Sequence, residues 1–183
     1  MVILITGGAG FIGSNLIHYW LAKNPGDTIV NFDALTYAGN PANLAGVESN
    51  PNYHFFQGDL RKQEQLDEVF EQFSIDSVIH LAAESHVDRS INDPSPFIDS
   101  NIKGTFQLLE TARKHWQKDL KNHRFHHVST DEVYGTLGKE GFFNEQTPFA
   151  PNSPYSSSKA SSDHLVLALS LIHISEPTRL GMI

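Results

Sequence analysis

Tyr155 and Lys159 are the residues whose types and spacing point most directly to chemistry. They are four positions apart in the segment SPYSSSK, at the start of a predicted helix, so they should lie on one helical face. An unperturbed tyrosine has a pKa of about 10 and is a weak base at neutral pH, but a neighbouring ammonium favours its phenolate form. The pair is therefore a candidate proton acceptor, although alone this pattern is more typical of a helix surface than of a site.

A second candidate follows an apolar-leaning run at residues 125–128, in the segment STDEVYG. It places the hydroxyl of Thr130 beside the carboxylates of Asp131 and Glu132, where a buried strand is expected to end. Two neighbouring carboxylates suit acid and base roles, because their mutual repulsion raises the pKa of one of them. The alternative is that Asp131 and Glu132 cap the turn and face solvent.

A glycine-rich turn lies near the start of the chain, in ILITGGAGFIGSNL. Gly7, Gly10 and Gly13 are spaced G-x-x-G-x-x-G between a predicted strand and a predicted helix. In such a turn the first glycine permits the bend, the second lets the backbone approach a pyrophosphate, and the third lets the helix pack close to the strand. Free N–H groups and the positive dipole end at the helix N-terminus favour phosphates, so the turn predicts a dinucleotide site.

Two acids follow later predicted strands. Asp33 ends the second strand, where a carboxylate accepts hydrogen bonds from an adenosine ribose and repels a 2′-phosphate, which favours NAD over NADP. The alternative for Asp33 is a turn-capping or helix-capping acid. Asp59 closes the third strand and could reach the adenine amino group or cap the helix that begins at Lys62, and these two roles are compatible.

Elements that could position these residues alternate along the chain. Short apolar runs predict strands at residues 2–6, 28–32, 54–57, 77–81 and 125–129, and helical patterns lie at residues 11–23, 62–73, 96–117 and 154–168. Residues 36–51 and 138–153 are predicted loops. Alternating strands and helices indicate an α/β fold with a Rossmann-like, doubly wound parallel sheet, whose ligands sit at the carboxyl ends of its strands.

Composition narrows the class of protein. The 183 residues, 39% hydrophobic and 19% charged, suit one soluble globular domain, and the net charge of −8 argues against non-specific nucleic-acid binding. The absence of cysteine excludes disulfides, thiol catalysis and Cys-ligated zinc, and the pair His126-His127 lacks metal-ligand spacing, so no metal is expected. No signal peptide or membrane span is evident, which makes the cytoplasm the default expectation.

The segments TGGAGFIG, HLAAESHVDRSI, STDEVYG and YSSSKASSDHLV together resemble the extended short-chain dehydrogenase/reductase family, and within it the dTDP-glucose 4,6-dehydratases. The resemblance runs from Met1 to about Ala168, roughly the N-terminal half of such an enzyme. It implies an incomplete NAD-binding domain at residues 1–168 and a missing C-terminal substrate domain. The chain as written is therefore expected to be inactive or nearly so, with the fifth strand as an open edge.

The resemblance also implies which residues contact the ligands. Small alanines let the backbone approach the cofactor after the fourth strand, and Ser100 or Asn101 could reach the nicotinamide ribose, with helix packing as an equal alternative. The implied NAD-binding residues are Gly7, Gly10, Phe11, Ile12, Gly13, Asp33, Ala34, Leu35, Thr36, Asp59, Leu60, Leu81, Ala82, Ala83, Ser85, Ser100, Tyr155 and Lys159. The implied contacts to the sugar or its phosphates are Ser85, His86 and Thr130, with plain loop residues as the alternative for the first two.

The implied reaction removes water from C5 and C6 of a nucleotide-linked hexose, with dTDP-glucose the favoured substrate. NAD takes a hydride from C4 while Tyr155, supported by Lys159, accepts the hydroxyl proton. Glu132 then removes the C5 proton, protonated Asp131 donates to the departing C6 hydroxyl, and the hydride returns to C6. Thr130 hydrogen-bonds the C4 oxygen. The helices at 96–117 and 154–168 commonly form a dimer bundle in this family, so a homodimer is expected of the full-length enzyme.

Other functions stay open at this point. Within the enzymes these are a dehydratase for another nucleotide sugar, a sugar 4-epimerase and a nucleotide-sugar decarboxylase. A non-catalytic dinucleotide-binding protein is the alternative from another class.

The end of the chain carries an unusual segment, LSLIHISEPTR, at residues 169–179. Its eleven residues resemble the in-frame translation of a sequencing-library adapter. We expect residues 169–183 to be non-native, and the alternative is a natural helix tail.

Overall fold

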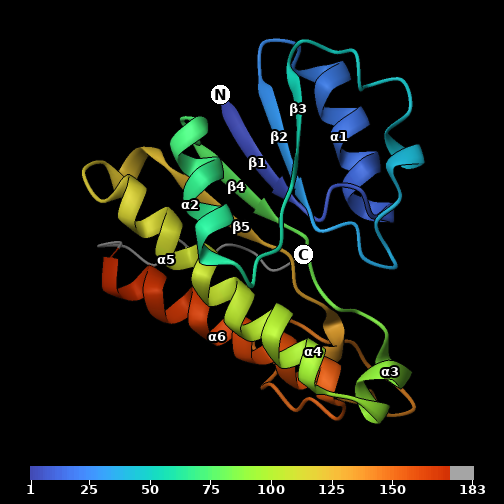
Figure 1. The fold of residues 1–183 in the computed structure, drawn as a ribbon. Helices are drawn as coiled ribbons and strands as arrows, with labels where there is room; N and C mark the ends of the chain where they lie inside the picture. The colour runs from blue at the N-terminus through green and yellow to red at the C-terminus, as the bar shows by residue number, and fades with distance from the viewer. Residues whose placement is uncertain (174–183) are drawn as a thin grey trace. The chain divides into compact units, whose positions relative to one another are not determined.

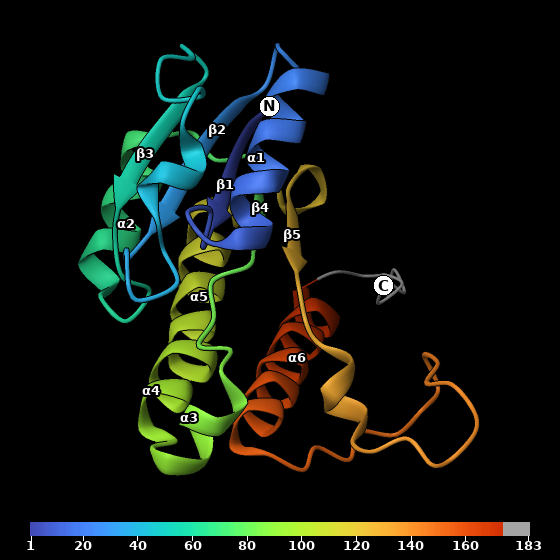
Figure 2. The ribbon, with the colours of Figure 1, turned by 90° about the vertical axis from the view of Figure 1, so that its right-hand side faces the viewer.

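The computed structural model describes residues 1–173, with side chains to residue 170. It divides into two compact units (Figures 1 and 2). Unit 1 comprises residues 1–82 and 107–128, and unit 2 comprises residues 83–106 and the described residues from 129 onward. Each unit is described by itself.

Unit 1 is built on a five-stranded sheet in which every pair of neighbouring strands is parallel. The strands are β1 (Val2–Thr6), β2 (Thr28–Asp33), β3 (Tyr53–Gln57), β4 (Ser77–His80) and β5 (Arg124–His127), in the spatial order β3-β2-β1-β4-β5. The order reverses beside β1, as in Rossmann-like sheets. The predicted α/β fold is confirmed, and the predicted strand ends differ by one or two residues.

Helices cover both faces of this sheet (Figure 1). On one face α1 (Phe11–Lys23) buries Ile17 and Leu21 against β1 and β2, beside the short 3-10 helix η1 (Pro41–Leu44). On the other face α2 (Gln63–Gln72) and α5 (Thr105–Trp116) bury a second cluster around Leu66 and Leu108. Each buried Leu, Ile or Phe contributes about 1.5–3 kcal/mol relative to an exposed one, so the two clusters stabilise the sheet.

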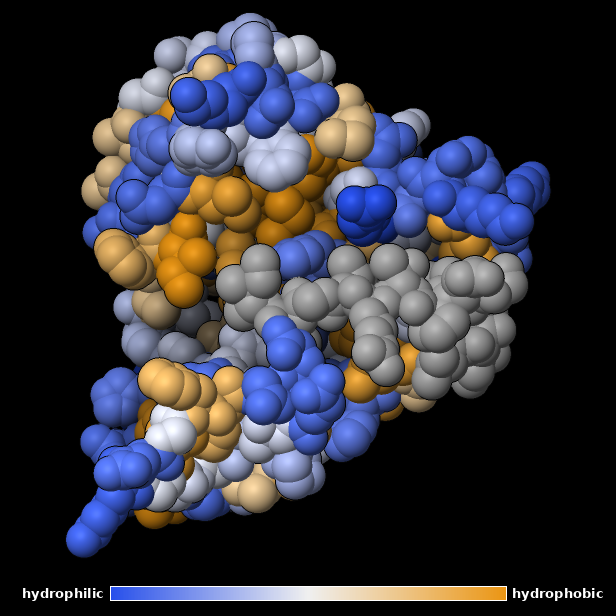
Figure 3. Space-filling view, turned by 180° about the vertical axis from the view of Figure 1, so that it is seen from behind, coloured by the Kyte–Doolittle hydropathy of each residue, from blue (hydrophilic) through white to orange (hydrophobic). Residues whose placement is uncertain are grey.

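Strand β5 lies at one edge of the sheet among the described residues, as the sequence predicted. It follows the short 3-10 helix η3 (Leu120–Asn122), and its side chains alternate between exposed and half-buried. Ile79 of the neighbouring β4 is only half-buried. Figure 3 shows apolar surface, in orange, on this unit.

Unit 2 is mainly helical (Figure 2). It contains α3 (Val87–Asn92), α4 (Ser95–Phe97), a π-helical turn η2 (Ile98–Gly104), a 3-10 turn η4 (Asp131–Tyr134) and α6 (Pro154–His173). Helix α6 packs against η2, α3 and α4.

Two predictions about unit 2 and its borders were wrong in detail. The single helix expected at 96–117 is instead α4, the π-helical turn and α5 in succession, and α3 has no counterpart among the predicted helices. Helix α6 continues beyond Ala168 to His173, into the predicted tail. The remainder of that tail, residues 174–183, lies outside the described residues, so the assignment of 169–183 as non-native stays a prediction.

Within residues 1–173, the helices lack the combination of length and apolar composition that crossing a bilayer requires.

Candidate functional site

The glycine turn of unit 1 depends on the absence of side chains at two positions. Gly7 has φ +73°, and its N–H donates to the Phe32 carbonyl at 2.9 Å. A Cβ at Gly7 would lie 2.7 Å from the backbone nitrogen of Ala82, and a Cβ at Gly13 would overlap the Gly7 carbonyl oxygen. The first glycine therefore permits the bend and the third permits close packing of α1, as the motif predicts.

The N-terminus of α1 leaves its first turn accessible. Gly10 is the N-cap residue, and its carbonyl accepts from the Ser14 N–H at 3.0 Å, while α1 has no side-chain cap. Phe11 is 82% exposed and Ile12 is 62% exposed. Uncapped N–H groups at an exposed helix start, together with the helix dipole, suit an anionic group such as a phosphate.

Asp33 organises the backbone around this turn. Its Oδ2 accepts from the Ala9 N–H at 2.9 Å, and its Oδ1 accepts from the Leu35 N–H at 2.8 Å, although the residue is almost fully buried. Leu35 has φ +52°, a conformation that non-glycine residues rarely adopt, so the connection after β2 holds some strain. Asp33 is thus a turn-capping acid, as the alternative proposed, and each oxygen keeps a second lone pair for a ribose hydroxyl.

The remaining predicted cofactor residues of unit 1 follow the carboxyl ends of β2, β3 and β4. Ala34 and Thr36 lie in the connection that Asp33 organises, and Leu81 and Ala82 are half-buried directly after β4. Leu60 is 7% exposed and packs in the hydrophobic core, so its side chain serves the fold.

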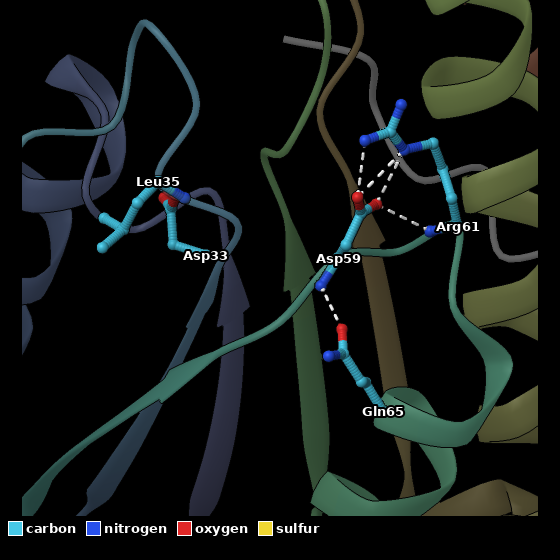
Figure 4. Close-up of polar contacts among 5 residues, drawn as sticks. All are labelled: Asp33, Leu35, Asp59, Arg61 and Gln65. Carbon is cyan, nitrogen blue, oxygen red and sulfur yellow. Dashed lines mark hydrogen bonds and ion pairs between the residues drawn. The ribbon is translucent and has the colours of Figure 1, made fainter.

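Asp59 does not cap α2, and this prediction was wrong. Its carboxylate is bound by the guanidinium of Arg61, with Nη2 2.6 Å from Oδ2 and Nε 2.9 Å from Oδ1 (Figure 4). The Asp59 N–H donates to Gln65 Oε1 at 2.8 Å, and Lys62 is the N-cap residue of α2 without a side-chain cap. The hydrogen bond from Arg61 is the largest cause that lowers the pKa of Asp59.

Sequence reasoning missed a buried polar pair beneath the glycine turn. Thr6 Oγ1 and His80 Nδ1 share a hydrogen bond of 2.7 Å, and Thr6 Oγ1 also accepts from the Ala82 N–H at 3.2 Å. Thr6 and His80 are paired in register at the ends of β1 and β4. The pair fixes the start of the segment after β4 against β1. The sequence did contain a signal for this pair, because Thr6 and His80 are polar residues that each end an apolar strand.

In unit 2, Thr130 joins the strand-end segment to α6. It is the N-cap residue of η4, where its Oγ1 accepts from the Glu132 N–H at 3.3 Å, and its hydroxyl is hydrogen-bonded to the Tyr155 phenol. The Tyr155 N–H donates to Ser90 Oγ at 3.1 Å, and its ring packs edge-on against Phe97 with ring centroids 6.3 Å apart. These contacts bring together two of the predicted catalytic residues.

The two acids of the strand-end segment lie in the first turn of η4. Asp131 is exposed and Glu132 is half-buried. The alternative prediction was that Asp131 and Glu132 cap the turn and face solvent. The cap is instead Thr130, so the capping role is wrong, whereas exposure to solvent is correct for Asp131. The turn is held in place by the buried side chain of Val133, whose carbonyl accepts from the Ala150 N–H at 2.9 Å.

The surroundings of Tyr155 and Lys159 shift the pKa of each residue away from its ordinary value. Burial raises the pKa of Tyr155, a hydrogen bond from Thr130 opposes this change, and the nearby charges of Glu132, Asp131 and Asp163 raise it further. Burial lowers the pKa of Lys159 to about 8, against a smaller opposing effect of Asp163. The pKa of Tyr155 is therefore raised and not lowered, because desolvation and the nearby carboxylates outweigh the hydrogen bond from Thr130.

Asn101 is occupied by helix packing. It is 1% exposed; its Oδ1 accepts from the Glu84 N–H at 2.8 Å, and its Nδ2 donates to the Glu84 carbonyl at 2.9 Å and to Ser158 Oγ at 2.9 Å. The packing alternative thus accounts for Asn101. The other predicted contacts of unit 2 are half-buried Ala83 and Ser100, and exposed Ser85 and His86.

The chain is similar to known proteins over nearly all of its length. A family model described as GDP-mannose 4,6 dehydratase matches residues 4–171. A dTDP-glucose 4,6-dehydratase from Neisseria meningitidis is 56% identical over 171 residues, which cover 91% of this chain and 48% of that protein. The resemblance predicted from the motifs is confirmed.

Solved structures agree with this relationship. The crystal structure of dTDP-glucose 4,6-dehydratase from Bacillus anthracis in complex with NAD is 47% identical, with a TM-score of 0.83 over 94% of this chain and 51% of that one. A UDP-glucose 4-epimerase from Thermus thermophilus in complex with NAD has the same TM-score of 0.83 at 31% identity, over 94% of this chain and 52% of that one.

The chain spans about half the length of the relatives it matches. Its glycine turn, its strand-end acids and its Tyr155–Lys159 pair all lie inside the matched region, residues 4–171. The chain belongs to the GDP-mannose 4,6 dehydratase family.

Proposed function

We propose that this chain is the N-terminal, catalytic half of an NAD-dependent nucleotide-sugar 4,6-dehydratase that acts on dTDP-glucose. The observation that carries the proposal is the arrangement in unit 2, where the hydroxyl of Thr130 is bonded to the phenol of Tyr155 directly before Asp131 and Glu132. Identity of 56% to a protein named dTDP-glucose 4,6-dehydratase supports this choice of reaction and substrate.

The residues of unit 1 fit NAD. The turn at Gly7 and Gly13 has no room for side chains, the start of α1 is uncapped and exposed, and Asp33 keeps free lone pairs on a carboxylate that would repel a 2′-phosphate. NAD would supply the hydride acceptor for C4 and the hydride donor for C6. We expect NAD to bind to this chain at least about tenfold more tightly than NADP, as calorimetric titration would measure.

The first step is oxidation of the sugar at C4. Tyr155 accepts the proton of the C4 hydroxyl, and Thr130 hydrogen-bonds the C4 oxygen to orient it. Lys159, one helical turn away, favours by its charge the phenolate form that Tyr155 needs in order to accept this proton, and the transfer leaves a neutral phenol. The ketone then makes the neighbouring C5 proton acidic, which it is not in the parent sugar.

The second step is elimination across C5 and C6. Glu132 removes the C5 proton as the base, and protonated Asp131 donates to the departing C6 hydroxyl as the acid. The double bond that forms accepts the stored hydride at C6 and a proton at C5, which gives a 4-keto-6-deoxy sugar. Two adjacent carboxylates on one short turn can divide these roles.

A sugar 4-epimerase is the second candidate, because the epimerase from Thermus thermophilus shares the fold. Epimerization needs C4 oxidation and reduction only, so it has no use for Asp131 and Glu132. Their presence at the end of the strand that leads to Thr130 favours dehydration.

Several properties of the whole protein belong to the same proposal. A homodimer, a cytoplasmic location and inactivity of the isolated 183-residue chain are all expected. The cytoplasm is supported by the charge of both ligands, which keeps them from crossing membranes. Inactivity is supported by the length of the relatives, about half of which this chain does not cover.

A chimera tests the function directly. Residues 1–168 of this chain would replace the matching half of the Neisseria meningitidis relative, and the purified protein would be incubated with dTDP-glucose. We expect the 4-keto-6-deoxy product, detected by mass spectrometry as the loss of one water. The unmodified relative is the positive control.

Two outcomes would contradict the proposal. A folded chimera that binds NAD and epimerizes the sugar at C4 would identify the second candidate function instead. A folded chimera that neither oxidises nor dehydrates any nucleotide hexose would support the non-catalytic alternative.

A further inference from the structure

Asp163 is a buried acid that the proposed reaction does not use. It lies on α6 one helical turn after Lys159, and both residues are 5% exposed. Residues four apart on a helix share one face, so the two opposite charges are neighbours. Burial of a carboxylate is expensive unless it is paired and hydrogen-bonded, so its position inside the unit requires an explanation.

Ser129 provides one partner for this acid. Its hydroxyl donates to Asp163 Oδ2 at 2.6 Å, a short, charge-assisted hydrogen bond. Ser129 directly precedes Thr130, whose hydroxyl is bonded to Tyr155. Two adjacent residues of the strand-end segment are thus attached to α6 at points about two helical turns apart, which fixes both position and direction of that segment.

The charge of Asp163 also acts on the ionisable residues around it. It raises the pKa of Lys159, against the lowering by burial, and it raises the pKa of Tyr155 and of Tyr134. The other charged groups that act on Tyr155 are Glu132 and Asp131, both on η4. Of these three carboxylates, Asp163 alone lies on the helix that carries the tyrosine and the lysine.

We propose that Asp163 is a positioning residue of the catalytic unit, with two roles that rest on the proposed function. Its carboxylate anchors the segment that begins at Ser129 to α6, and its charge keeps Lys159 protonated one turn from Tyr155. The first role aligns Thr130 and the acids that follow it. The second preserves the ammonium beside the phenol, which opposes the direct effect by which Asp163 raises the pKa of Tyr155.

Two substitutions separate these roles in the 183-residue chain. Asp163→Asn removes the charge but keeps an oxygen that accepts from Ser129, whereas Ser129→Ala removes the anchor but keeps the charge. Asp88→Asn on α3 is the matched control, because Asp88 is exposed in the same unit. Thermal unfolding of each variant shows whether it is folded.

The charge role is measured by NMR titration of ¹³C-labelled lysine, with the Lys159 signal assigned by Lys159→Met. We expect Asp163→Asn to lower the pKa of Lys159 below its value of about 8, and Asp88→Asn to leave it unchanged. A Lys159 titration in folded Asp163→Asn that matches that of the parent chain would overturn this role.

The anchoring role is measured by hydrogen exchange of two amides of η4 and its C-cap. These are the Glu132 N–H, bonded to Thr130 Oγ1, and the Gly135 N–H, bonded to the Glu132 carbonyl. Ser129→Ala should exchange these amides at least about tenfold faster, whereas Asp163→Asn should change them little. Unchanged exchange in Ser129→Ala would refute the anchor, and this test remains decisive if Asp163→Asn does not fold.

Activity of the chimera provides a third readout. Asp163→Asn should lower kcat at neutral pH by about tenfold or more and leave KM for the nucleotide sugar nearly unchanged, because the acid touches neither ligand in the proposed reaction. A parent chimera without activity would refute the proposed function, whereas the titration and the exchange would still decide the roles of Asp163.

Discussion

The candidate functional residues of unit 1 differ in kind from those of unit 2. In unit 1 the candidate ligand contacts come mainly from the backbone. The glycine turn has two positions without room for a Cβ, the start of α1 is uncapped, and the Asp33 carboxylate holds backbone N–H groups in place. Unit 2 offers buried side chains that ionise, with Tyr155, Lys159 and Asp163 all at or below 9% exposure.

This difference predicts where each unit is vulnerable. A site built from backbone is sensitive to steric additions, and the backbone N–H groups that it offers do not titrate. A site of buried ionisable residues lowers the free energy of unfolding, because desolvation opposes each charge. The size of this effect changes with pH, because it depends on whether each residue is charged. Four predictions test this contrast, in order of decreasing effect.

Gly7→Ala should have the largest effect. Alanine would meet both the positive φ of this residue and the backbone of Ala82, so we expect a loss of roughly 4 kcal/mol in the free energy of unfolding, measured by urea denaturation. Gly26→Ala is the control, because its Cβ would meet no atom within 4 Å. Equal effects of the two substitutions would contradict the steric account of the turn.

Asn101→Ala should come next, because it removes three hydrogen bonds from a buried residue of unit 2. At about 1 kcal/mol for each bond we expect a loss of roughly 3 kcal/mol, measured in the same way. The side chain of the exposed Asn92 donates to the Asp88 carbonyl at 3.1 Å, and Asn92→Ala should cost less than about 0.5 kcal/mol. A small effect at Asn101 would show that the π-helical turn does not depend on this residue.

Lys159 should make the stability of the chain increase with pH. Its pKa is about 8 in the folded chain and about 10.4 when unfolded, so between these values the unfolded state binds more protons and stability rises. From about pH 8 to about pH 9.5 the gain should be about 1.6 kcal/mol, before the tyrosines ionise. Lys159→Met should remove this increase, and a parent chain whose stability is flat over this window would contradict the shift.

Arg61→Gln should have the smallest effect. The ion pair with Asp59 is partly exposed, so its loss should cost less than about 1 kcal/mol. The pKa of Asp59 should rise towards its ordinary value, because the lowering by Arg61 is lost, and the stability contributed by the pair should disappear in the parent as pH falls through that pKa. A larger loss of stability would mean that Asp59 supports the fold of unit 1 beyond this pair.

The sequence predicted unit 1 better than unit 2 for a physical reason. Strands of a parallel sheet are continuous apolar runs, and a glycine turn between a strand and a helix is a local pattern, so both are visible within a few residues. In unit 2 the decisive contacts join distant residues, such as Asn101 with Ser158 and Ser129 with Asp163. A pattern within a few neighbouring residues cannot predict contacts between residues so far apart in the sequence.

Asp59 shows that a residue with two suitable partners nearby is also hard to predict from its neighbours. The position of Asp59 before α2 suited an N-cap, but Arg61 two residues later binds the carboxylate instead. Likewise, the spacing of Tyr155 and Lys159 was sufficient to identify the pair but not the direction in which each pKa is shifted. Those shifts depend on burial and on Asp163, neither of which the spacing specifies.

The most direct test of the account is the substitution of both acids, Asp131→Asn with Glu132→Gln, in the chimera with the Neisseria meningitidis relative. With dTDP-glucose, the account predicts that NADH absorbance accumulates while no dehydrated sugar forms, because C4 oxidation by Tyr155 and Lys159 survives without the elimination step. The control Glu140→Gln, at an exposed acid in the following loop, should dehydrate normally. Normal dehydration by the double variant, or loss of NAD binding in place of elimination, would contradict the assignment of the two acids.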